Sequence, residues 1–179
     1  MTNLHPQREN RLSCLKRNPL DTLEQDHARQ AGLCDILEQI ADSLPADMDS
    51  GRCREAASAL RHDLPLHHQD EEEGLFPLLR HHASQSEKLA AIMARLSSEH
   101  AADEGFAEEL SEQLESLARG ESPSNPEALG YMLRGFFESY RRHIHWENEI
   151  LLPLARETLT EGDLDELFRC MANHRQAIS

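Results

Sequence analysis

The sequence has few aromatic residues and few residues that break helices. Aromatic side chains make up 4% of the 179 residues, and glycine and proline contribute eight residues each. Leucine, alanine, glutamate and arginine, which favour helices, are abundant instead. This composition predicts an all-α fold, and the chain is long enough for one domain that buries a core without disulfides.

Basic residues and long hydrophobic runs are also scarce. The chain carries 18 lysine and arginine residues against 33 acidic ones, which gives a formal net charge of −15. Such a charge repels phosphate backbones and anionic lipids, so we expect no nucleic-acid partner and no membrane partner. No segment approaches the roughly 18 apolar residues of a membrane span, and the N-terminus has no apolar targeting region. We therefore expect a soluble cytoplasmic protein.

The four cysteines stand far apart in the sequence, and no two of them form a Cys-x-x-Cys pair. A zinc ribbon and a dithiol redox site both need closely spaced thiols, so the spacing argues against each of them. We expect free thiols, and Cys34 falls on the apolar stripe of the first predicted helix, as a small core residue would. The cysteines are Cys14, Cys34, Cys53 and Cys170.

Apolar residues at helical spacing predict five helices behind a short N-terminal arm. Residues 1–17 are polar and show no lasting periodicity, so we assign them to the arm and residues 18–179 to a helical domain. Two Asn-Pro pairs, each an N-cap followed by a proline at the first helical position, mark the starts of the first and fourth helices. We expect Pro65 and Pro77 to kink the second helix. The predicted helices cover about residues 19–43, 50–80, 84–119, 126–154 and 161–174.

Two segments of the chain repeat the same pattern of potential metal ligands. Each contains a His-x-x-x-Glu pair followed by apolar residues and a proline, and a single histidine stands about 40 residues ahead of each pair. On a helix, residues four apart lie on one face about 6 Å from each other, so the imidazole and carboxylate of a pair aim at one point. The pairs are His67 with Glu71 and His143 with Glu147, the prolines are Pro77 and Pro153, and the single histidines are His27 and His100.

The helix register predicts that these side chains meet. The two histidines of each half lie about equally far from the turn between their helices, which places them level in a helical hairpin. Packing the two hairpins as an up-down four-helix bundle then collects four imidazoles and two carboxylates in one interior layer. A lone buried histidine is usually a hydrogen-bonded core residue. The repeat favours a metal site instead, because each unpaired buried polar group costs about 1 to 3 kcal/mol. The predicted ligands are His27, His67, Glu71, His100, His143 and Glu147.

The predicted donors are nitrogen and oxygen atoms without thiolate, which suits iron, manganese or zinc. Two carboxylates that can each bridge, with two histidines on either side, fit a pair of ions better than a single ion. We expect iron, because open positions on such a centre bind O2 or NO, with zinc and manganese as the alternatives. Ferritin-like bundles use Glu-x-x-His on two helices, and they fit less well because Glu24-x-x-His27 has no counterpart before His143.

These motifs resemble the hemerythrin-like (HHE cation-binding) domain family. The resemblance covers about residues 18–158 and rests on segments that recur in both halves of the chain. It implies a four-helix bundle around two oxo- or hydroxo-bridged iron ions, with Glu71 and Glu147 bridging them. By the same resemblance, one iron takes His27 with His67 and the other takes His100 with His143. The segments are Asn18-Pro-Leu-Asp21 ahead of His27, His67-x-x-x-Glu71-x-x-x-Leu-Phe-Pro77, His100, and His143-Ile-x-x-Glu147-x-x-x-Leu-Leu-Pro153.

The sequence departs from oxygen-carrying hemerythrins at Glu104, where those proteins have a second histidine one turn after the first. The ligand set is similar instead to the four-His, two-Glu set of di-iron proteins linked to iron–sulfur cluster repair and nitrosative stress. Glu104 is either a third ligand near His100 or an exposed carboxylate, and Tyr140 either orients a ligand or fills the core. Other polar residues fall off the inward stripe. We expect a solvated face for most of them, namely His68, Glu72, Glu73, His81, His82 and His145.

Two functions follow from such a centre, with a third as an alternative. The first is a module that binds or senses O2 or NO, or holds iron, without turnover. The second is an enzyme that reduces NO or peroxide, or assists iron–sulfur cluster repair. The third is a zinc bundle in which the metal only holds the fold together. The sequence indicates a small gaseous ligand as the partner and does not set the oligomeric state.

Overall fold

The computed structural model describes residues 18–46, 48–82 and 86–177. Within these ranges every regular element is helical, which confirms the predicted all-α fold. None of the helices there combines the length and the hydrophobicity that a membrane crossing requires. The expected N-terminal arm, residues 1–17, lies outside the described ranges, so its assignment stays a prediction.

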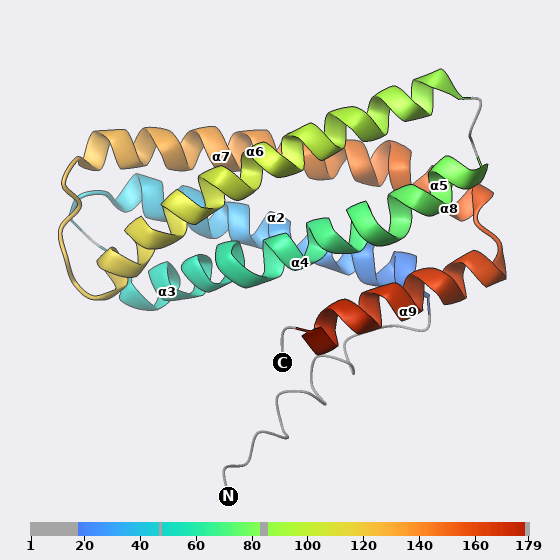
Figure 1. Cartoon of the computed structure of the whole chain (residues 1–179). Helices are drawn as coiled ribbons and strands as arrows, with labels where there is room; N and C mark the ends of the chain where they lie inside the picture. The colour runs from blue at the N-terminus through green and yellow to red at the C-terminus, as the bar shows by residue number, and fades with distance from the viewer. Residues whose placement is uncertain (1–17, 47, 83–85, 178–179) are drawn as a thin grey trace, which may run out of the picture.

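Four helical rods lie side by side, and one further helix packs against them (Figure 1). The first rod is α2 (Pro19–Ser43) and the third is α6 (Glu87–Ala118). The second and fourth rods are α-helical segments joined by π-helical turns, in which each turn holds one extra residue. The second rod runs through α3 (Ser50–Ser58), η1 (Ala59–Asp63), α4 (Leu64–Gln69), η2 (Asp70–Leu75) and α5 (Phe76–His82). The fourth rod runs through α7 (Pro126–Trp146), η3 (Glu147–Leu151) and α8 (Leu152–Thr158), and α9 (Glu161–Ala177) follows it.

Both Asn-Pro pairs begin a helix, as predicted. The Asn18 side chain accepts a hydrogen bond from the Leu20 N–H at 3.0 Å, and the Asn125 side chain accepts one from the Ala128 N–H at 3.0 Å. At the end of α6, Gly120 has a φ of 83°, the left-handed conformation that commonly follows a helix. These local signals set where each rod begins and ends. They thereby determine which residues of neighbouring rods lie at the same position along the bundle axis.

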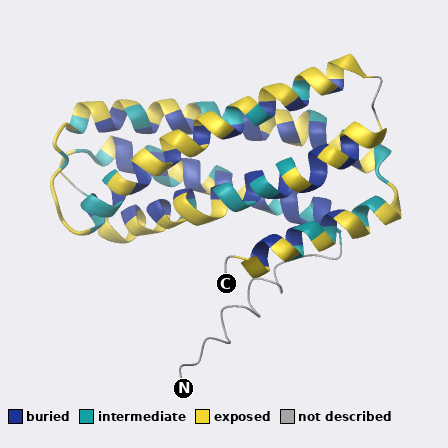
Figure 2. Ribbon diagram, viewed as in Figure 1, coloured by how far each residue is buried: buried dark blue, intermediate teal, exposed yellow. Residues whose placement is uncertain are grey.

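The core consists of two apolar clusters with a polar layer between them. In α2, Leu20 and Leu23 belong to one cluster, Leu33 and Cys34 belong to the other, and His27 lies between. Cys34 has no exposed surface, as predicted. The other three rods also pass from one cluster to the other, at His67 and His100 in the second and third rods and at Glu147, between Ile144 and Leu151, in the fourth. Figure 2 shows the buried residues as a stripe along the inner faces of the rods. The polar layer therefore lies in the middle of the bundle, away from both ends.

Prolines accompany the π-helical turns, and two of these turns carry the glutamates of the repeat. A proline lacks the N–H that would bond the carbonyl four residues before it, which allows the helix to widen by one residue there. The carbonyls of Glu71 and Glu147 each accept a hydrogen bond from the N–H five residues further on. The π-helical turns η1, η2 and η3 end two residues before Pro65, Pro77 and Pro153, so the first two fall where we expected kinks.

Candidate metal centre

The structure brings the six predicted ligands together in the polar layer. They form two groups that share both glutamates, and the potential ligand atoms of each group lie within 4.8 Å of one another. All six side chains are buried, with no more than 3% of any residue exposed. The first group is His27, His67, Glu71 and Glu147, and the second is Glu71, His100, His143 and Glu147.

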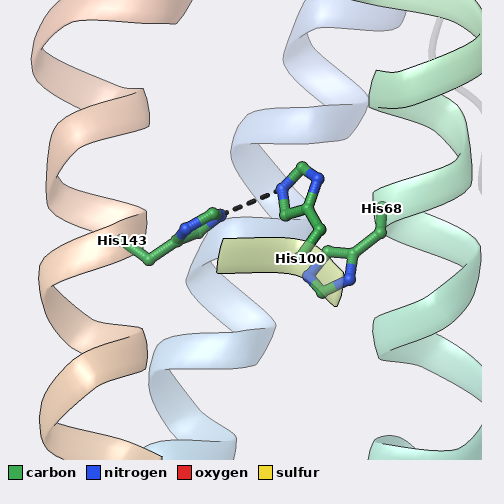
Figure 3. Close-up of side chains that lie close together, drawn as sticks. All are labelled: His68, His100 and His143. Atoms are coloured by element: carbon green, nitrogen blue, oxygen red, sulfur yellow. Dashed lines mark hydrogen bonds between the residues drawn. The ribbon is translucent and has the colours of Figure 1, made fainter. Parts of the chain in front are cut away.

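The imidazoles meet in two pairs, as the hairpin register predicts. The Nε2 atoms of His27 and His67 are 3.1 Å apart, and those of His100 and His143 are also 3.1 Å apart (Figure 3). Two imidazole nitrogens that each lie about 2 Å from one ion, at roughly a right angle, would be about 3 Å apart. Each pair therefore has the spacing of two neighbouring ligands of a single ion.

The two glutamates lie between these imidazole pairs. Glu147 places Oε2 at 3.2 Å from Nε2 of His27 and Oε1 at 2.9 Å from Nε2 of His143. Glu71 turns Oε1 toward His27 and Oε2 toward His100, at 3.8 and 3.3 Å from their Nε2 atoms. All four carboxylate oxygens are buried, and none has a hydrogen-bond partner among the residues that the structure describes. A buried acceptor without a partner lowers the stability of the fold. These oxygens are therefore suited to ligate cations, which would provide the missing partners.

The electrostatics of the layer also favour cations. Burial lowers the pKa of His27, but its contacts with Glu147 and Glu71 outweigh burial and raise that pKa to about 10. The same balance raises the pKa of His100 to about 11, whereas burial lowers the pKa of His67 to about 4. Burial raises the pKa of each glutamate, yet the imidazoles bring the pKa of Glu71 to about 2 and that of Glu147 well below its ordinary value. The two carboxylates therefore stay ionised and attract positive charge. Protons on the imidazoles supply that charge here, and metal cations would supply it in their place.

Three of the histidines are oriented by acceptors outside the layer. Nδ1 of His27 lies 2.7 Å from Oδ1 of Asn148, which accepts from Nδ1–H and leaves Nε2 to face the two glutamates. Nδ1 of His100 pairs with Oε1 of Glu72 at 2.8 Å, and Nδ1 of His143 pairs with Oε2 of Glu99 at 3.0 Å. The sequence expectation of a solvated Glu72 is wrong in this respect, because its carboxylate is only partly exposed and bonds a candidate ligand. Glu99 and Asn148 carry no sequence signal beyond standing next to His100 and Glu147.

His68 departs furthest from expectation, because it is buried beside the metal centre rather than on a solvated face. It is 1% exposed, and its ring stacks on that of His100 with centroids 4.1 Å apart (Figure 3). Its Nε2 is 3.3 Å from the Tyr140 hydroxyl and its Nδ1 is 3.2 Å from Oε1 of Glu104. Burial lowers the pKa of His68 to about 4, so the ring is neutral. His67 and His68 are neighbours in the regular segment α4, and His68 is buried because side chains of α6 and α7 cover it, which the inward stripe of one helix does not reveal.

The two residues that the sequence left open are also placed. The Glu104 side chain is 48% exposed and belongs to neither ligand group, which agrees with the exposed alternative. Tyr140 has no exposed surface, and its ring lies parallel to that of His143 with centroids 5.5 Å apart. Tyr140 thus fills the core and also contacts a candidate ligand. Glu24 bonds Arg156 near the surface at 2.9 Å, so the ferritin-like alternative has no support here.

A helical bundle with an inner layer of four imidazoles around two shared carboxylates defines a class of metal-binding protein. A model of the hemerythrin HHE cation-binding domain matches residues 18–155, and the chain belongs to that family. The family binds metal ions, typically iron. Comparison with curated proteins and with solved structures found no match. Helix α9 lies beyond the matched residues.

Proposed function

We propose that the chain is an up-down four-helix bundle that holds two iron ions in the polar layer. His27 and His67 would hold one ion, His100 and His143 the other, and Glu71 and Glu147 would bridge them. The observation that carries this proposal is the set of four buried carboxylate oxygens, each turned toward an imidazole and none hydrogen-bonded within the described part of the chain. A structural zinc bundle is the less favoured reading, because the shared carboxylates form two ligand groups rather than one closed tetrahedral set.

The function that this centre supports best is reversible binding or sensing of O2 or NO. Two imidazoles and one oxygen from each glutamate give each ion four protein ligands, fewer than the six common for iron. Iron, when bound, supplies open coordination positions at which such a small gas binds. The protein contributes the apolar clusters on both sides of the layer, which exclude water from it.

A second candidate is an enzyme that reduces NO or peroxide. The observation that favours it is a hydrogen-bonded chain from the exposed Glu104 carboxylate through His68 to the buried Tyr140 hydroxyl. Nδ1–H of His68 donates to Glu104, so Nε2 accepts from the hydroxyl of Tyr140. This chain links solvent to a hydroxyl next to His143, as proton supply during turnover requires.

Exposure of the reduced, iron-loaded chain to O2 and to NO separates the two candidates. A carrier or sensor changes its near-ultraviolet and visible spectrum and returns to the starting spectrum when the gas is removed. An enzyme consumes reductant and accumulates product over many cycles. No spectral change with either gas would contradict both candidates.

A further inference from the structure

A cavity lies beside His67 on the side of the bundle that α9 covers. Its volume is about 270 Å³, and its lining comes from α2, η1 and α4 and from Arg175 of α9. Helices α2, α4 and α9 contact one another and lie together in Figure 1. Arg29 and Asp63 are exposed members of the lining, so the cavity reaches the surface. In the proposed metal centre, Nε2 of His67 faces the ion, so the other ring nitrogen, Nδ1, faces the cavity.

Two buried polar atoms of the cavity lining have no hydrogen-bond partner within the described ranges. They are Oε1 of Gln30 and Nδ1 of His67, on residues that are 5% and 2% exposed. Oδ2 of Asp26 is 3.9 Å from this Nδ1, which is too far for a hydrogen bond. Nε2 of His67 faces His27 and Glu71, where it acts as an acceptor or as a metal donor, so Nδ1 carries the hydrogen. The lining therefore offers one N–H donor and one carbonyl acceptor.

The two arginines of the lining already pair with carboxylates. Arg29 forms an ion pair with Asp26, and Arg175 lies 2.8 Å from Oδ2 of the buried Asp70. The two arginines in the lining are balanced by two aspartates, Asp26 and Asp63. An anion would have to displace these carboxylates, and the lining carries no net charge, so a neutral molecule fits it best.

The remaining lining is largely apolar and large enough for an aromatic ring. Leu33 and Leu64 are buried, and Ala59 and Leu66 are partly buried. An apolar cavity of about 150 Å³ holds benzene, so this larger space holds a substituted ring. Apolar walls with a few convergent polar groups are typical of sites for small organic molecules.

We propose that this cavity binds a neutral organic molecule that carries a hydroxyl group on an apolar body, of the phenol class. The hydroxyl oxygen accepts from Nδ1–H of His67 and the hydroxyl hydrogen donates to Oε1 of Gln30. The ring packs against Leu33 and Leu64. The bound molecule then contacts the imidazole of a candidate metal ligand from the side opposite the ion.

The test uses the full chain as isolated and two fluorinated probes, followed by fluorine NMR. 4-Fluorophenol carries the hydroxyl, and fluorobenzene is the matched probe without it. We expect saturable binding of 4-fluorophenol that is roughly three- to tenfold tighter than that of fluorobenzene, as one or two hydrogen bonds provide. Absence of saturable binding, or equal affinity for the two probes, would overturn the proposal.

Three variants locate the site. Gln30→Leu removes the acceptor and should reduce the affinity for 4-fluorophenol to that for fluorobenzene, whereas Gln39→Leu, at an exposed position of the same helix, should change neither. Ala59→Phe fills the cavity and should abolish binding of both probes. Unchanged binding in Gln30→Leu, or in a folded Ala59→Phe variant, would overturn the proposal. Metal content of each variant, measured in parallel, distinguishes a failure of this proposal from a failure of the metal centre.

Discussion

Glu147 contacts both imidazole pairs with a single side chain, through Oε2 near His27 and Oε1 near His143. Glu147→Gln keeps the shape of the side chain but removes its charge and one of its two ligating oxygens. We predict that the variant loses about 100-fold or more in metal affinity, measured by competition with a chelator of known affinity. Glu149→Gln, at an exposed position of the same turn, should behave as the parent protein does. Equal affinities in the two variants would exclude a ligand role for Glu147.

Glu72 reaches the proposed metal centre through His100, whose Nδ1 it contacts at 2.8 Å. A carboxylate in this position fixes the tautomer of the imidazole and increases its basicity as a ligand. Glu72→Gln should therefore lower metal affinity by about 10- to 100-fold, with the number of ions bound at saturation unchanged. Glu112→Gln, at an exposed position of α6, serves as the control. A Glu72→Gln variant that loses one ion altogether would show that Glu72 ligates the metal rather than orienting His100.

At the scale of elements, α9 holds the π-helical turn that carries Glu71. The neighbouring Asp70 is buried between two side chains of α9, with His174 and Arg175 each 2.8 Å from one of its oxygens. Burial raises the pKa of Asp70, while Arg175 and His174 act to lower it. Close packing adds to these ion pairs, because a Cβ atom on Gly74 would lie 2.7 Å from Cδ1 of Leu167.

This contact makes Gly74 a probe of the interface between η2 and α9. Gly74→Ala should lower the free energy of unfolding by about 1 kcal/mol, because Leu167 has to move within a packed core. Gly105→Ala provides the opposite control. An added Cβ there meets nothing within 4 Å in the middle of α6, so the variant should gain about 0.5 to 1 kcal/mol. Urea unfolding of both variants measures the difference, and a stabilised Gly74→Ala would contradict the close packing.

The positions of the helices, and the fact that the candidate ligands share one layer, could be predicted from the sequence because both depend on local rules. An Asn-Pro start fixes where a rod begins, and a four-residue spacing places His143 and Glu147 on one face. The environment of His68 could not be predicted, because it depends on contacts with His100 of α6 and Tyr140 of α7 that the spacing along one helix does not contain. The contact between Glu99 and His143 joins different rods, and nothing in the spacing of either residue signals it.

At the scale of the whole molecule, the candidate ligands of the proposed metal centre come from all four rods and form one layer between two apolar clusters. Ions that bind only the folded chain stabilise it by about 4 kcal/mol when present at roughly 1,000 times their dissociation constant. We predict that removal of metal by a chelator lowers the melting temperature and that added ferrous iron restores it. The double variant His67→Ala/His143→Ala should show no such response. A melting temperature that is independent of metal in the parent chain would contradict the proposed layer.

The most direct test of the central claim is elemental analysis of the full chain, prepared without a metal-affinity tag, together with its near-ultraviolet spectrum before and after dithionite. The proposed centre predicts about two irons per chain and an absorption band that dithionite bleaches. Zinc alone, or one ion per chain without such a band, would leave the helical bundle intact and contradict the di-iron centre and its gas chemistry.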